Sequence, residues 1–150
     1  MKAAKRLAAV AMAALLTGCG GSGGGSGDGG HGEGESFAGI WKGEISIVRN
    51  NCNLAADDTI QTTLTVNQAD SEVVVDIPSG DTFTGTATDT RLNASKVEAI
   101  ECPGGTLSQQ IEFGRDAGSD DALVTIQFTT RCGAFQCDLN YLGSLKRTVG

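Results

Sequence analysis

The chain has 150 residues, with 18 acidic and 11 basic side chains and a formal net charge of −7 at pH 7. Nucleic acid and anionic lipid surfaces attract basic proteins, so this acidic balance makes them poor partners for the folded body, and no nucleic-acid partner is expected. The length suits one folded domain with a modest core.

The first predicted element is a signal peptide over residues 1–18. Three basic residues lie ahead of a mostly apolar run at 7–16, which is too short to span a bilayer as a permanent helix. The run ends in LTGC, which resembles the lipobox of bacterial lipoproteins. This resemblance implies cleavage before Cys19 and acyl chains (diacylglycerol, and commonly palmitate) on Cys19. It also implies an anchor in a bacterial membrane, with the domain in the periplasm or at the cell surface. In such lipoproteins an aspartate after the cysteine favours the inner membrane, so the resemblance implies that Gly20 favours the outer membrane.

Residues 19–36 are predicted to form a tether behind the lipidated cysteine. Ten of the sixteen residues from Gly20 to Glu35 are glycine, a composition typical of a flexible linker. Cleavage before Cys19 would leave eight basic and eighteen acidic residues, a formal net charge of −10. A body with that charge favours basic protein partners over anionic ones.

Residues 37–150 alternate between apolar and polar side chains with a period of two, which is typical of half-buried strands. Turn residues interrupt the alternation at regular spacing. In chain order, the apolar faces expected to point inward run over Trp41–Ile47, Ile60–Val66, Val73–Ile77, Phe83–Ala87, Leu107–Phe113, Val124–Phe128 and Leu139–Arg147.

One further segment, residues 90–102, loses its alternation near Ser95. We expect a strand with a β-bulge or a sheet edge at that point, because both neighbouring segments are strands. One or two turns of helix are the alternative. With this strand the domain has eight strands and belongs to the all-β class, as an antiparallel up-and-down barrel or, alternatively, a β-sandwich.

The start of the first strand resembles the GxW motif of the calycins, the group of lipocalins and avidins, through Gly39 and Trp41. In those barrels the tryptophan closes one end and a basic side chain of the last strand packs across it. The resemblance assigns that role to Arg147. It implies that Trp41 and Arg147 lie at the same rim and form a cation–π contact.

Four cysteines follow Cys19, namely Cys52, Cys102, Cys132 and Cys137. An even number in an exported chain predicts two disulfides and no metal site. In an eight-strand meander all four gather at the rim opposite Trp41. One pairing joins Cys132 to Cys137 and therefore Cys52 to Cys102. The other joins Cys52 to Cys137 and Cys102 to Cys132, and the sequence alone leaves both open.

The domain offers little for catalysis, because the only histidine lies at position 31, in the tether. No cofactor motif is present, so a non-catalytic binding module is expected. The first hypothesis is a small apolar ligand inside the barrel, held among Ile45, Ile47, Leu64, Val75, Phe83, Ile111, Phe128 and Tyr141. The alternatives are a module that binds a basic protein, such as an inhibitor of lysozyme or of a protease, and a structural surface lipoprotein.

Overall fold

The computed structural model describes residues 36–148. The predicted signal peptide, Cys19 and nearly all of the predicted tether lie outside these residues. None of the described residues belongs to a helix that is long and apolar enough to span a bilayer.

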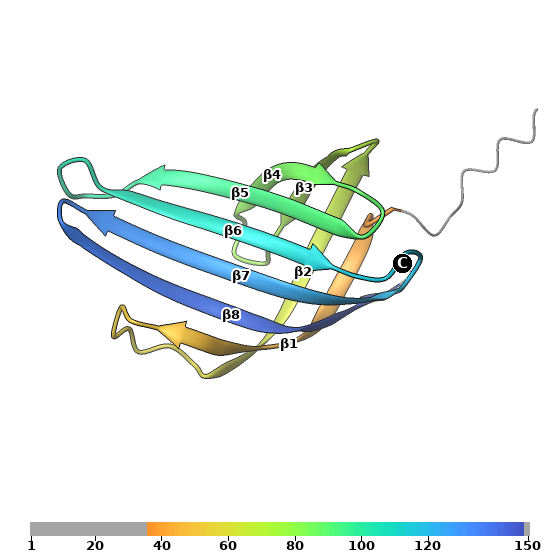
Figure 1. The fold of residues 1–150 in the computed structure, drawn as a ribbon, viewed down its shortest axis with the longest axis horizontal. Helices are drawn as coiled ribbons and strands as arrows, with labels where there is room; N and C mark the ends of the chain where they lie inside the picture. The colour runs from red at the N-terminus through yellow and green to blue at the C-terminus, as the bar shows by residue number, and fades with distance from the viewer. Residues whose placement is uncertain (1–35, 149–150) are drawn as a thin grey trace, which may run out of the picture. The chain divides into compact units, whose positions relative to one another are not determined.

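Eight antiparallel strands follow one another around a closed barrel, and the last pairs with the first (Figure 1). The strands are β1 (Gly39–Asn50), β2 (Thr59–Ala69), β3 (Glu72–Asp76), β4 (Thr82–Ala87), β5 (Arg91–Ala99), β6 (Thr106–Gly114), β7 (Asp121–Cys132) and β8 (Phe135–Thr148). The all-β up-and-down barrel is therefore confirmed, and the sandwich alternative is wrong. Because each strand pairs with its sequence neighbours, every connection is short.

The predicted alternation places the apolar side chains inside the barrel. Trp41 and Ile45 on β1 are almost fully buried, as are Leu64 on β2 and Leu145 on β8. Glycine is needed where β1 and β8 approach closely: an added Cβ at Gly43 would collide with the backbone oxygen of Ser144. The small residue lets the two strands coil tightly enough to close the barrel.

The segment 90–102 contains a strand, as expected, and its irregularity is an edge rather than a bulge. The β5–β6 register runs without a break from Arg91 to Ala99, whereas β4 pairs with β5 only as far as Ser95. Beyond Ser95 the inward-facing positions of β5 are polar, and the outward-facing Val97 is 65% exposed. The apolar pattern changes parity there because that part of β5 has lost its neighbour on one side.

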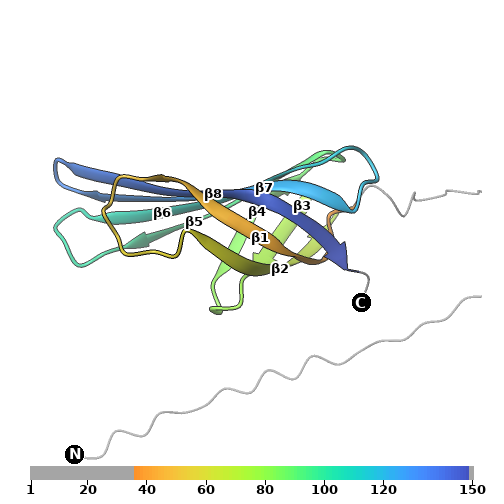
Figure 2. The ribbon, with the colours of Figure 1, turned by 90° about the horizontal axis from the view of Figure 1, so that it is seen from below.

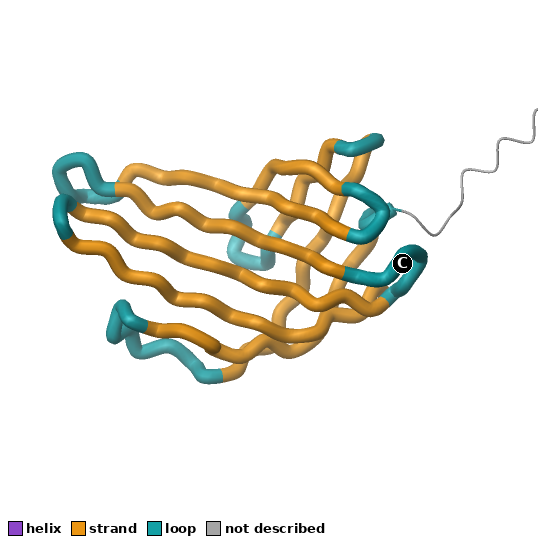
Figure 3. Tube along the Cα trace, viewed as in Figure 1, coloured by secondary structure: helices purple, strands orange, loops and turns teal. Residues whose placement is uncertain are grey.

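The strands differ in length, and this difference forms the open end. β3 and β4 have 5 and 6 residues, whereas β7 and β8 have 12 and 14. The loop between β3 and β4 therefore ends well short of the loops that connect β5 to β6 and β7 to β8 (Figure 3). In Figure 2 the connection from β1 to β2 lies at the same end as the β5–β6 and β7–β8 loops.

Candidate binding cavity and the two ends of the barrel

Aromatic side chains close the end of the barrel at which β1 starts. Trp41 is fully buried, and its indole Nε1–H donates a hydrogen bond of 2.8 Å to the carbonyl oxygen of Phe37. The Phe113 ring packs edge-on against both Phe37 and Trp41, with centroid separations of 5.9 and 5.5 Å. Edge-to-face packing at these separations is favourable. Phe37, just before β1, thus completes a three-ring plug that the sequence motif alone did not include.

Arg147 lies across this plug. It is the register partner of Trp41 in the β1–β8 pair, and its guanidinium carbon lies 5.8 Å from the indole centroid. Its Nη1 donates to the Ser36 carbonyl oxygen at 2.7 Å, and its Nε donates to the Asp120 carboxylate at 2.7 Å. A Cβ at Gly39 would lie 3.1 Å from the Arg147 side chain. The structure therefore brings Gly39, Trp41 and Arg147 together at one rim.

Arg115 is a second cation at this end, and the sequence analysis missed it. Its guanidinium carbon lies 4.0 Å above the centre of the Phe37 ring, and its Nη1 donates to the Ser119 carbonyl oxygen at 3.1 Å. Burial, followed by the nearby positive charge of Arg147, lowers the pKa of Arg115. Arg115 continues the inward parity of β6 by one step beyond Gly114, and this alternation is the signal that could have found it.

Two disulfides stand at the opposite end, as predicted. They join Cys52 to Cys137 and Cys102 to Cys132, with Cα–Cα distances of 4.8 and 6.0 Å. The pairing of Cys132 with Cys137 is therefore wrong. In the β7–β8 register Cys137 lies opposite Thr130 rather than Cys132, and the end of β1 brings Cys52 alongside Cys137 from the other side.

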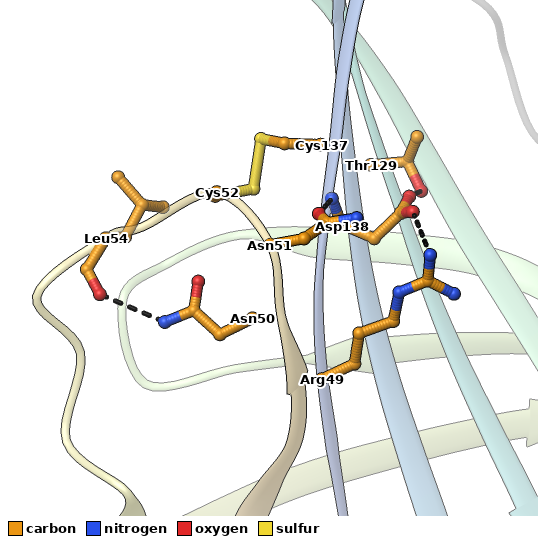
Figure 4. Close-up of a disulfide and its surroundings, with 8 residues drawn as sticks. All are labelled: Arg49, Asn50, Asn51, Cys52, Leu54, Thr129, Cys137 and Asp138. Carbon is orange, nitrogen blue, oxygen red and sulfur yellow. Dashed lines mark hydrogen bonds and ion pairs between the residues drawn. A yellow bond between two sulfur atoms is a disulfide. The ribbon is translucent and has the colours of Figure 1, made fainter.

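Polar contacts hold the segment around Cys52 against β8 (Figure 4). Asn51 Oδ1 accepts a hydrogen bond from the Asp138 backbone N–H, and Arg49 forms an ion pair of 3.4 Å with the Asp138 carboxylate. Asn50 Nδ2 donates to the Leu54 carbonyl oxygen at 3.0 Å. The register shift between Ile47 and Arg49 makes this arrangement possible, because it leaves one extra residue in β1.

A cavity of about 520 Å³ opens between this disulfide-bonded rim and the core. Five of the eight residues expected to surround a ligand line it, namely Ile45, Phe83, Ile111, Phe128 and Tyr141. The other three do not. Leu64 and Val75 are fully buried in the core below the cavity, and Ile47 packs against that core. The interior of the barrel is thus filled at one end and hollow at the other.

Loop residues complete the cavity wall, and the strand pattern did not predict them. Cys52 and Leu54 come from the β1–β2 connection, and Pro78 and Ser79 come from the β3–β4 loop. The described lining residues carry no charged side chain. The cavity wall is therefore largely apolar, with a few hydroxyl and amide groups, as is typical of sites for small molecules.

Tyr141 is the most buried of the polar groups in this wall. It is 7% exposed, and its ring meets Phe128 edge-on at 6.4 Å between centroids. Burial, and after it the negative charge of Asp57, raises the pKa of Tyr141. Its hydroxyl is therefore protonated at neutral pH and available as a donor.

An ion triad of Lys96, Asp81 and Glu98 lies where β5 has lost its neighbour. Lys96 on β5 contacts the Asp81 carboxylate of the β3–β4 loop and, at 2.7 Å, the Glu98 carboxylate. The hydrogen bond with Asp81 is the main reason that the pKa of Lys96 is raised, and the same bond lowers the pKa of Asp81. The triad thus ties the loop that carries Pro78 and Ser79 to the long side of the barrel.

Comparison of the chain with protein-family models, with curated proteins and with solved structures found no match. The class of this protein is therefore defined by its fold and by the geometry of its cavity. They define a small closed antiparallel β-barrel with two disulfides at one rim, an aromatic plug at the other end and an apolar cavity between.

Proposed function

We propose that this chain is an exported, lipid-anchored binding protein that holds a small apolar molecule in the cavity at the disulfide-bonded end of its barrel. The observation that carries the proposal is the cavity itself, about 520 Å³ with an uncharged, largely apolar wall. Apolar surface facing water costs about 25 cal/mol per Å², so a ligand that covers this wall is bound favourably. The volume lies within the range of sites that take small molecules.

The role is binding rather than catalysis. The described lining residues hold one hydroxyl-bearing aromatic group and a few small polar side chains, with no pair of acid and base close to one another. The LTGC motif and the glycine-rich segment support an anchor at Cys19, most simply in the outer membrane, with the barrel in the periplasm or at the cell surface.

A neutral fluorescent probe tests the proposal directly. N-Phenyl-1-naphthylamine is weakly fluorescent in water and brightens in apolar surroundings, so we expect saturable enhancement by the purified barrel. Ile60→Trp places a larger side chain in the cavity wall and should abolish the enhancement. Leu123→Trp is the matched control, because Leu123 points outward from β7 and is 55% exposed.

Both variants are first checked for an unchanged β-sheet spectrum and cooperative unfolding. Absence of saturable binding to the unmodified protein contradicts the proposal, and so does equal binding by the folded Ile60→Trp and Leu123→Trp variants.

A further inference from the structure

Tyr141 is placed as a single polar contact inside an apolar cavity. On β8 its register partners are Ile47 on β1 and Ile126 on β7, so its side chain shares the inward face of three neighbouring strands. It lines the cavity and is 93% buried, and the structure gives its hydroxyl no hydrogen bond to another described residue. The only buried side-chain oxygen or nitrogen without a partner among the described residues is Asn50 Oδ1, so the Tyr141 hydroxyl is open to water in the cavity. A bound molecule that covers the apolar wall displaces this water, and it gains affinity if it supplies a hydrogen bond in its place.

The partner that suits the Tyr141 hydroxyl best is a hydrogen-bond acceptor. The aromatic ring draws electron density from the phenolic oxygen, which makes the hydroxyl a better donor than acceptor. Its raised pKa keeps the proton in place at neutral pH. A carbonyl oxygen on an otherwise apolar molecule satisfies this donor and leaves the surrounding apolar wall covered.

The surroundings disfavour a negatively charged acceptor. None of the described lining residues is a cation, and Lys96, which is not one of them, is already paired with Asp81 and Glu98. The Asp57 carboxylate acts on the Tyr141 hydroxyl through its negative charge. A carboxylate in this cavity would lose its hydration and gain no counter-charge, which is strongly unfavourable.

From this geometry we infer that the cavity takes a neutral ketone or ester with an apolar chain, that the Tyr141 hydroxyl donates to its carbonyl oxygen, and that the matching carboxylate is rejected. The inference rests on the proposed function, because it names the class of ligand for the same cavity. Tyr141 is then the residue that determines specificity, whereas the apolar wall supplies most of the affinity.

Competition between two molecules of equal carbon number tests the inference. 2-Tridecanone and tridecanoate are each titrated against bound N-phenyl-1-naphthylamine. We expect the ketone to displace the probe with an affinity at least about tenfold higher than that of the carboxylate. Tyr141→Phe removes only the hydroxyl and should weaken the ketone about three- to tenfold, the usual worth of one hydrogen bond. The affinity of each protein for the probe is measured first, so that both displacements are converted into affinities for the ketone and the carboxylate.

A second measurement reports on the hydroxyl itself. Tyr141 is the only tyrosine in the chain, so the absorbance of tyrosinate during an alkaline titration follows this one group. A bound ketone that accepts its hydrogen bond should raise the pKa of Tyr141 further, whereas the probe, which has no carbonyl group, should raise it less.

The outcomes separate the two claims. Failure of N-phenyl-1-naphthylamine to bind the unmodified protein overturns the proposed function. Normal probe binding, together with equal displacement by ketone and carboxylate, or with a Tyr141→Phe variant that binds the ketone unchanged, overturns the inference about the ligand class alone. Asp57→Asn removes a negative charge near Tyr141. It should lower the pKa of Tyr141 and reduce the ratio of the affinity for the ketone to the affinity for the carboxylate. An unchanged ratio contradicts the inference that the Asp57 charge helps to reject the carboxylate.

Discussion

Trp41 and Arg147 are 106 positions apart in the chain, yet they face each other across the β1–β8 pair, with 5.8 Å between the guanidinium carbon and the indole centroid. The contact joins the first strand to the last and therefore exists only when the barrel is closed. Arg147 also reaches Asp120 in the β6–β7 loop. The Arg147 side chain on β8 thus contacts both β1 and the β6–β7 loop at this end of the barrel.

Arg147→Ala should lower the free energy of unfolding by about 1–2 kcal/mol, because packing and cation–π attraction are lost. It should also change the fluorescence of Trp41, the only tryptophan in the chain. Lys146→Ala, whose side chain is exposed, should lie within about 0.5 kcal/mol of the unmodified protein. Urea unfolding followed by tryptophan emission measures both, and equal effects of the two substitutions would contradict the role given to Arg147.

Arg115→Met should destabilise the barrel by about 1–3 kcal/mol. The change removes the cation above Phe37 and the two partly buried hydrogen bonds that Arg115 donates to the carbonyl oxygens of Asp89 and Ser119. Arg131→Met, at an exposed position of β7, is the matched control and should be close to neutral. Chemical unfolding of both variants decides the point. A stable Arg115→Met protein would mean that the plug holds without its second cation.

Removing the Cys52–Cys137 bridge should cost more stability than removing Cys102–Cys132. The first spans 85 residues and the second 30, and loop-closure entropy gives about 4.6 and 3.6 kcal/mol respectively. The two double-alanine variants, compared by denaturant unfolding, test the order. Peptide mapping of the non-reduced protein should recover these two pairs, and a Cys132–Cys137 linked peptide would refute the connectivity.

The Lys96–Asp81 contact makes stability sensitive to acid. Because this hydrogen bond lowers the pKa of Asp81 in the folded state, its contribution is present above the unfolded pKa and is lost as the pH falls through the lower folded value. Asp81→Asn should therefore flatten the fall in unfolding temperature between about pH 5 and pH 2, whereas Asp70→Asn should not. Parallel curves for Asp81→Asn and the unmodified protein would show that the ion triad contributes nothing.

Cys19→Ser should release the protein from membranes or block its processing, because acyl chains on Cys19 would supply the anchoring free energy at about 0.8 kcal/mol per buried methylene. Fractionation of cells that produce each form, followed by gel migration, measures this. A serine variant that fractionates and migrates like the original would refute the lipid anchor.

The period-two pattern alone determined the strand content and the inward faces of this protein. Trp41, Phe83 and Leu145 were all placed inside correctly, because local alternation decides which side of a strand is buried whatever its partners are. The strand count and the turn signals also predicted eight antiparallel strands, but they left the choice between a barrel and a sandwich to the tertiary structure. The same local rule carried one step further, from Phe113 across Gly114, would have predicted a buried Arg115.

Only the tertiary structure decided what the pattern does not encode. The pairing of Cys52 with Cys137 depends on how β1 and β8 are aligned, and a register shift after Ile47 sets that alignment. Whether an inward side chain fills a core or lines a cavity depends on the lengths of the strands opposite it. Leu64 is packed, whereas Tyr141 borders a cavity, because β3 and β4 end early and leave one end of the barrel open. The alignment of two strands and the place where a neighbouring strand ends are properties of the closed barrel, and no local stretch of sequence determines them.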